Sequence, residues 1–304
     1  MKTFHLTQSS MTENLGVEPS AVAVGFFDGV HKGHQRVIET AQREAKEKGL
    51  KSAVMSFDPH PSVVLKKGKV HARYITPLPE KEKILKKMGI DYFFVITFNQ
   101  ELAQLAPQTF VDHFFVNLQI RHVVAGFDFS YGHKGRGSME TLPDHARGRL
   151  THTIISKVEE DEEKISSTRI RQLLDHGYVE EAESLLGRPF SVVGDVKGTN
   201  EVQDYSLVNL DIDSDFYPLK MGVYAVKISC DDQWFSGIAS VLREQENPSL
   251  NVYLFDGKRE LYGTTVRVDF HRFIREEQTF ERTEDLKAQI EKDASHTREF
   301  FRID

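Results

Sequence analysis

The stretch that most limits how this chain can fold runs from Gly25 to His34 and reads Gly-Phe-Phe-Asp-Gly-Val-His-Lys-Gly-His. An apolar segment, Ala21–Phe27, leads into a turn with glycines, and a helical pattern begins just after it. Glycines let a backbone approach an anion, and the first turn of a helix presents unpaired N–H groups and a partial positive charge. His31 and His34 add donors at the same place. The stretch therefore predicts a strand, a phosphate-binding turn and a helix.

A second segment with the chemistry of a phosphate site lies far downstream, at Ile165–Arg171. Its sequence, Ile-Ser-Ser-Thr-Arg-Ile-Arg, places hydroxyl and guanidinium groups at the start of another helical pattern. Hydroxyls cap a helix N-terminus, and guanidinium groups bind phosphate oxygens in pairs. Taken alone, the segment is better explained as an N-cap with a surface arginine. Together with the first stretch, it indicates a binding site for a nucleoside triphosphate.

Length and composition indicate a soluble protein of two domains. A chain of 304 residues exceeds what one hydrophobic core usually serves, and its hydrophobic content of 39% is enough to build two cores. A formal charge of -7 and the lack of a basic stripe argue against nucleic acid as a partner. A single cysteine, Cys230, excludes an intrachain disulfide and a cysteine-based metal cluster. The start of the chain is polar, and no apolar run approaches the roughly 20 residues that cross a bilayer. We therefore expect a cytoplasmic protein without a membrane partner.

Residues 1–187 alternate apolar runs with helical patterns, which is typical of a parallel sheet flanked by helices. The expected strands are Ala21–Phe27, Lys51–Phe57, Tyr92–Phe98 and His122–Phe127, and the expected helices are His34–Lys48, Lys81–Met88 and Pro107–Leu118. Ligands of such sheets bind beyond the carboxyl ends of the strands. Three segments follow directly on strands, namely the Asp28 turn, Phe57–Pro61 and Gly126–Gly132, so we expect them to face one crevice. The acidic run Glu159–Glu163 is expected to be a solvated loop rather than a metal site.

Beyond Gly187 the pattern changes to alternating segments, which predict an antiparallel barrel or sandwich. The expected strands are Val192–Val196, Gly222–Ile228, Trp234–Val241, Asn251–Phe255 and Thr264–Phe270. Two short helices, Ser167–Asp175 and Val179–Leu186, precede this region, and an amphipathic helix, Thr283–Phe301, closes the chain.

Four boxes in this order resemble the bacterial FAD synthetases, which usually join an FMN adenylyltransferase module to a riboflavin kinase module. The boxes are Gly25–His34, Phe57–Pro61, Gly126–Phe129 and Ile165–Arg171. The first box alone also fits cytidylyltransferases, pantetheine-phosphate adenylyltransferases and class I aminoacyl-tRNA synthetases, whereas the second and third favour the flavin branch. The resemblance covers nearly the whole chain.

The resemblance implies an α/β fold class for the chain. An N-terminal Rossmann-like nucleotidyltransferase domain with a parallel sheet would occupy residues 1–187. A C-terminal riboflavin kinase-like antiparallel β-barrel with a terminal α-helix would occupy residues 188–304.

The kinase module departs from the family pattern. The family's Pro-Thr-Ala-Asn segment aligns with Ser206–Asn209, where Leu207 replaces the threonine that helps to hold Mg²⁺ and ATP. The preceding loop, Lys197–Val202, is shorter than in the family. Asn251 replaces the glutamate that acts as general base, and an amide cannot take up that proton. We therefore expect the kinase to be inactive.

The rest of the barrel keeps the family pattern, including the segment Ile274–Phe280, which lies on the flavin side in the family. The barrel is therefore expected either to bind flavin or to be a structural domain.

The resemblance implies transfer of AMP from ATP to FMN, with FAD and pyrophosphate as products, by direct in-line attack of an FMN phosphate oxygen. The implied catalytic residues are His31, His34 and Arg171. The implied ATP-binding and phosphate-binding residues are Gly25, Phe27, Asp28, Gly29, Gly33, Ser167 and Thr168. The implied flavin-binding residues are His60, Pro61 and Asp128. Mg²⁺ is expected to arrive with ATP, because no acidic cluster of the module forms a protein cage for it.

Some roles stay open at this point. Asp28 either orients the His34 loop or approaches the phosphate of FMN through Mg²⁺, and Asp128 either binds a ribose or ribityl hydroxyl or closes a tight turn. Two alternative functions are a bifunctional riboflavin kinase/FAD synthetase and a non-catalytic flavin-binding or regulatory protein. The sequence leaves the oligomeric state open.

Overall fold

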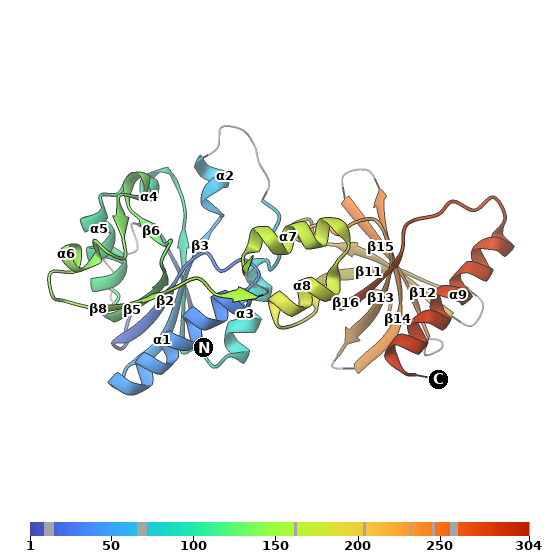
Figure 1. Cartoon of the computed structure of the whole chain (residues 1–304), viewed down its shortest axis with the longest axis horizontal. Helices are drawn as coiled ribbons and strands as arrows, with labels where there is room; N and C mark the ends of the chain where they lie inside the picture. The colour runs from blue at the N-terminus through green and yellow to red at the C-terminus, as the bar shows by residue number, and fades with distance from the viewer. Residues whose placement is uncertain are drawn as a thin grey trace. The chain divides into compact units, whose positions relative to one another are not determined.

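The computed structural model describes residues 1–8, 15–65, 72–160, 163–202, 205–231, 233–244, 247–255 and 261–303. The chain packs as two compact units, Met1–Ser166 and Ser167–Asp304 (Figure 1). Packing thus groups the two helices before Gly187 with the barrel. The predicted module boundary at 187/188 marks instead where the sequence pattern changes, and it stays a prediction.

The first unit contains a six-stranded parallel sheet in the order β1-β4-β3-β2-β5-β8. Its strands are β1 Lys2–Leu6, β2 Ser20–Val24, β3 Lys51–Asp58, β4 Tyr92–Thr97, β5 Ile120–Gly126 and β8 Thr151–Ile155. The four predicted strands are confirmed with shifted ends. The sequence reading missed β1 and β8, since both are edge strands whose polar and exposed residues give no buried apolar run.

Short helices connect these strands. They are α1 Lys32–Lys48, α2 Pro61–Leu65, α3 Leu78–Lys87, α4 Gln100–Ala103, α5 Pro107–Val111 and α6 Leu142–Ala146. The predicted helix Pro107–Leu118 is α5 followed by a π-helical turn, Asp112–Val116. Two two-stranded ribbons complete the unit, β6 Ser130–Tyr131 with β7 Gly137–Ser138 and β9 Glu159–Glu160 with β10 Glu163–Lys164.

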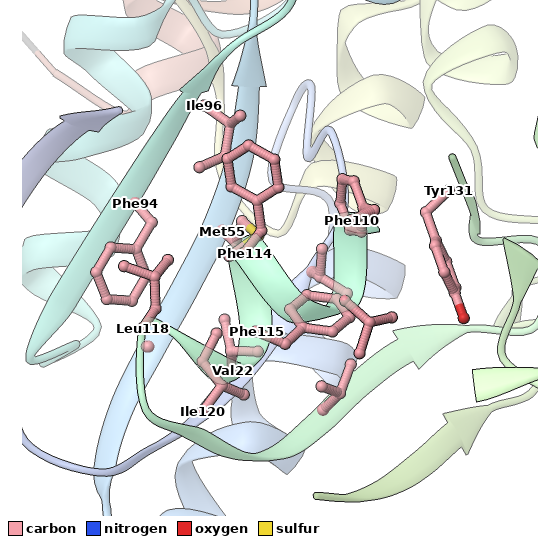
Figure 2. Packing of buried hydrophobic residues seen from close by; sticks show 14 of the residues in the cluster. Val22, Met55, Phe94, Ile96, Phe110, Phe114, Phe115, Leu118, Ile120 and Tyr131 are labelled. Atoms are coloured by element: carbon pink, nitrogen blue, oxygen red, sulfur yellow. The ribbon is translucent and has the colours of Figure 1, made fainter. Parts of the chain in front are cut away.

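Both faces of the parallel sheet are covered by apolar side chains. One cluster joins the sheet to α5 and the π-helical turn, and Figure 2 shows several of its aromatic rings, among them Phe94, Phe110, Phe114 and Phe115. Phe94, Phe114 and Phe115 in this cluster are fully buried, and each such ring stabilises the fold by about 1.5–3 kcal/mol. The second cluster joins the other face to α1 and α3. The sheet is therefore a rigid base for the loops at its carboxyl edge.

The second unit contains a closed antiparallel barrel in the order β11-β12-β15-β14-β13-β16, so the barrel rather than the sandwich is confirmed. Its strands are β11 Phe190–Val202, β12 Tyr205–Ile212, β13 Gly222–Cys230, β14 Gln233–Glu244, β15 Asn247–Leu254 and β16 Thr265–Arg275. The helices of this unit are α7 Ser167–His176, α8 Val179–Leu186 and α9 Thr283–Phe301. Strand β12 was not predicted from the sequence. The bounds of α7, α8 and α9 agree with those of the predicted helices to within one residue.

Helix α9 packs on the outside of the barrel. Ile290 and Ala294 of the helix contact a cluster of barrel side chains that includes Tyr205 and Ile238. Asp293, which is 1% exposed, forms an ion pair with Arg275 of β16 at 2.8 Å. Arg275 belongs to the segment with the possible flavin role, and here it fastens the terminal helix. Among the described residues, no helix is both long and apolar enough to cross a membrane.

Candidate active site

The predicted phosphate-binding turn lies at the carboxyl end of β2, between neighbours β3 and β5. The strand ends at Val24, so the turn begins three residues earlier than predicted. Phe27, Gly29 and Val30 have φ angles of 56°, 88° and 40°. Such left-handed backbone costs about 1–3 kcal/mol at non-glycine residues and tends to occur at functional sites. A Cβ on Gly25 would lie 2.9 Å from the Phe27 ring, so this position needs glycine.

Contacts from neighbouring segments hold the turn in this conformation. The Phe26 carbonyl accepts hydrogen bonds from Ser56 Oγ at 2.8 Å and from Lys81 Nζ at 2.7 Å. Asp28 is 2% exposed, and its Oδ1 accepts a bond from the Thr76 N–H at 3.0 Å. Asp28 therefore ties the turn to the segment before α3, and both of its expected roles stay predictions.

His31 and His34 lie together where α1 begins. His31 is the N-cap of α1, and its Nδ1 accepts a bond from the His34 N–H at 3.2 Å. The two rings stack with centroids 3.5 Å apart. A neutral imidazole that accepts at Nδ1 carries its proton on Nε2 and donates there. The cap therefore does not compete with a phosphate contact through Nε2. A Cβ on Gly33 would lie 3.1 Å from the His31 ring, which explains the glycine between the histidines.

Lys81 is a buried cation that the sequence reading missed. It belongs to α3, is 3% exposed, and also donates to Ser56 Oγ at 3.2 Å. Its Nζ lies 4.6 Å from the centroid of the Phe26 ring. Lys81 occupies the apolar stripe of its helix, three and four residues before Ile84 and Leu85, and a lysine in such a stripe is the signal that could have identified it.

Burial lowers the pKa of Lys81 from 10.5 to about 8, against the raising effect of Asp28 and Asp58. Below pH 8 the folded chain therefore carries a charge that its interior disfavours, at a cost of about 3 kcal/mol that disappears above the unfolded pKa. The free energy of unfolding of Lys81→Met, measured relative to that of wild type, should fall by about 2–3 kcal/mol between pH 7 and pH 10. Urea unfolding at the two pH values measures this change.

The same variant should lower the adenylyl transfer that the family resemblance implies about ten-fold or more, because the Phe26 carbonyl loses a donor and the turn can shift. Lys83→Met, on the exposed side of the same helix, is the matched control and should change neither quantity. A Lys81→Met protein with full activity and with the stability profile of wild type would contradict this role.

The residues expected to bind flavin lie at the same edge of the sheet. His60 follows β3, and its ring meets Phe26 edge-on with centroids 4.3 Å apart, while Pro61 begins α2. Asp128 follows β5, and its Oδ2 forms an ion pair with Lys164 Nζ at 2.6 Å. The strands before these segments are neighbours of β2, so the segments lie at the same edge of the sheet. That they face one crevice stays a prediction.

The described residues of the acidic run Glu159–Glu163 belong to the paired strands β9 and β10, where a solvated loop was expected. Glu160 lies in β9 and pairs with Lys32, the first residue of α1, at 2.9 Å. Lys164 of the partner strand β10 makes the ion pair with Asp128, and its Nζ lies 4.9 Å from the centroid of the Phe127 ring. Residues 161–162 of the run are outside the described residues. The sequence reading missed Lys164, which brings a cation to the predicted flavin side.

Ser167, Thr168 and Arg171 belong to the second unit, where they form the first turns of α7. Thr168 is exposed and Arg171 is half-buried. The guanidinium of Arg171 lies 5.5 Å from the centroid of the Tyr217 ring. The predicted hydroxyl and guanidinium groups thus lie at a helix N-terminus, as expected.

The positions that depart from the kinase pattern are neighbours in the barrel. Leu207 of β12 faces Tyr253 of β15, and Asn209 faces Asn251. The Asn209 amide donates to Asn251 Oδ1 at 2.6 Å. The β11–β12 ladder continues to the pair Val202 and Tyr205, so Gly198–Val202, in the segment where the family has its phosphate loop, are strand residues paired with β12.

Comparison with known proteins gives two family matches. The model described as FAD synthetase matches residues 15–169, and the one described as riboflavin kinase matches residues 186–301. A bifunctional riboflavin kinase/FMN adenylyltransferase of Listeria monocytogenes is 40% identical, over 99% of this chain and 98% of its own length. The protein of that description from Bacillus subtilis is 37% identical over the same shares.

One solved structure covers nearly the whole chain as well. It is a Streptococcus pneumoniae protein described as a macrolide-efflux protein, with a TM-score of 0.86 and 30% sequence identity. The alignment covers 98% of this chain and 99% of that chain.

Proposed function

We propose that this chain, which belongs to the family of bifunctional riboflavin kinase/FMN adenylyltransferases, makes FAD from FMN and does not phosphorylate riboflavin. The family establishes the chain as an FMN adenylyltransferase, a nucleotidyltransferase. One observation supports the assignment of its phosphate site, namely the strained turn that ends in two stacked imidazoles at the start of α1.

In the proposed reaction, a phosphate oxygen of FMN attacks the α-phosphorus of ATP. The new P–O bond joins FMN to AMP as FAD, and the bond between the α-phosphorus and the bridging oxygen breaks to release pyrophosphate. The protein contributes position and positive charge rather than a nucleophile. His31 and His34 donate to the α-phosphate, where negative charge builds up in the transition state.

The remaining proposed contacts come from the backbone of the turn and from the start of α7. The backbone of the turn, through Gly25, Phe27, Gly29 and Gly33, approaches the phosphates. Ser167, Thr168 and Arg171 hold the β- and γ-phosphates and the departing pyrophosphate. Mg²⁺ is proposed to enter with ATP and to neutralise phosphate charge there.

At the flavin end, the proposed contacts are His60, Pro61 and Asp128. The carboxylate of Asp128 is 60% exposed at its ion pair with Lys164, so a ribityl hydroxyl can reach it. The Phe129 N–H donates to the Gly126 carbonyl at 3.1 Å, so Asp128 also lies within a tight turn. Asp128 can therefore bind a ribityl hydroxyl and close a tight turn at the same time, so its two expected roles do not exclude each other.

The proposal that the kinase is absent depends on the barrel. Leu207 offers no oxygen to a hard cation. Asn251 offers an amide where a base is needed, and general-base catalysis is typically worth about 10² to 10⁴ in rate. Strand residues Gly198–Val202, paired with β12, replace the loop that would surround phosphates. These three departures concern metal, base and nucleotide separately, and together they favour loss of kinase activity over a bifunctional enzyme.

We also propose that the protein resides in the cytoplasm, because its single cysteine, Cys230, is buried and free and forms no disulfide.

The direct test of the adenylyl transfer incubates the purified chain with ATP, Mg²⁺ and FMN and measures FAD and pyrophosphate together. Direct attack predicts equal amounts of the two products and no AMP bound covalently to the protein. Binding of FMN without product would instead support the flavin-binding alternative.

A further inference from the structure

Helices α7 and α8 lie beside the barrel (Figure 1), and α8 contacts β16 and β11. The Lys220 N–H, in the loop between β12 and β13, donates to the Leu174 carbonyl near the end of α7 at 3.1 Å. Arg272 of β16 pairs with Glu180 of α8 at 2.7 Å. A Cβ on Gly177, between the helices, would lie 3.1 Å from the Phe273 ring of β16. The helix that begins with the second phosphate motif is therefore packed as a part of the barrel unit.

Tyr217 connects the barrel to the motif itself. It lies in the loop between β12 and β13, and the guanidinium of Arg171 lies over its ring, 5.5 Å from the centroid. Its hydroxyl donates to both carboxylate oxygens of Asp175, at 2.9 and 3.1 Å. Arg171 and Asp175 are one helical turn apart on α7, so one tyrosine contacts two successive positions of one helix face.

The tyrosine keeps its hydroxyl proton at physiological pH. Burial, with a smaller contribution from the bond to Asp175, raises the pKa of Tyr217 to about 12. The bond to the carboxylate therefore fixes the ring plane under Arg171. A planar guanidinium over a fixed aromatic face has fewer orientations than one that extends into water.

We propose that the barrel is retained as the platform of α7, and that its residue Tyr217 is a positioning residue that orients Arg171 for the leaving pyrophosphate. The inference depends on the proposed role of Arg171 and adds a reason for keeping the barrel without kinase chemistry. Under it, the barrel contributes to FAD formation through one loop, and the positions of the former kinase site take no part.

The test compares Tyr217→Leu, which removes the ring, with Tyr217→Phe, which keeps the ring and removes the bond to Asp175. Steady-state kinetics should show kcat/KM for ATP about ten-fold lower in Tyr217→Leu and about two- to three-fold lower in Tyr217→Phe. The KM for FMN should not change. Tyr262→Leu is the matched control, since Tyr262 is a 70% exposed tyrosine of the same barrel, and it should behave as wild type.

A double variant separates positioning from general stability. If Tyr217 acts through Arg171, Arg171→Ala/Tyr217→Leu should have the same activity as Arg171→Ala alone. A further ten-fold loss in the double variant, or unchanged kinetics in folded Tyr217→Leu, would overturn the inference. If Tyr217→Leu does not fold, Tyr217→Phe and Asp175→Asn are each compared in the wild-type protein and in the Arg171→Ala variant.

These outcomes also separate two failures. If Arg171→Ala keeps full activity, the proposed role of Arg171 is wrong, and the inference fails with it. If Arg171→Ala is impaired while the Tyr217 variants are not, only the inference fails.

Discussion

FAD formation should fall about 10³-fold in the double variant His31→Asn/His34→Gln. The two imidazoles are side-chain donors at the start of α1, where the proposed transition state gathers charge. Loss of one preorganised donor to such a centre typically costs about 10² to 10³ in rate. The expected loss lies in kcat, because the charge that the donors stabilise develops in the transition state.

The substitutions keep the fold testable. Asparagine is a favoured N-cap residue, so His31→Asn can still accept the N–H bond that His31 Nδ1 accepts at the start of α1. His296→Gln, at an exposed position of α9, controls for the loss of a histidine elsewhere. Thermal unfolding should be close to that of wild type in each protein. A folded double variant with wild-type turnover would show that phosphate chemistry does not depend on these rings.

Arg171→Ala should lower kcat/KM for ATP by about 10² to 10³. The same variant should bind pyrophosphate more weakly as a product inhibitor, because the guanidinium is proposed to hold the leaving group. Arg171→Lys should recover only part of the activity, since an ammonium group keeps the charge and loses the planar pair of donors.

Product inhibition assays with FMN held constant measure both effects. Arg282→Ala, at an exposed position of the same unit outside the motif, is the control and should change neither parameter. An Arg171→Ala enzyme with normal pyrophosphate inhibition would exclude contact with the leaving group.

The sequence predicted the regular parts of the first unit because their signals are local. Buried parallel strands read as apolar runs, and the glycine and histidine pattern marks where β2 passes into α1. The edge strands β1 and β8 were missed because half-exposed strands carry mixed residues. The strained turn could be predicted in place but not in shape, since its φ angles depend on Ser56, Thr76 and Lys81 from other segments.

The supporting residues of the site could not be read from motifs. Lys81, Lys164 and Tyr217 come from a helix stripe, a short hairpin and a barrel loop, and none of them lies next to its partner in the sequence. Their roles depend on tertiary contacts such as the ring contact between Tyr217 and Arg171. The changes at Leu207 and Asn251, by contrast, were visible in the sequence, because they alter the chemistry of single positions. The pairing of Asn209 with Asn251 required the barrel register.

The central claim is that this chain carries out one of the two reactions in its family's description. The most direct measurement gives the purified protein ATP and Mg²⁺ with riboflavin in one reaction and with FMN in another, and separates the flavins by chromatography. The account predicts FAD from FMN and unchanged riboflavin in the other reaction. FMN or FAD formed from riboflavin would contradict it and would show that the barrel still transfers phosphate.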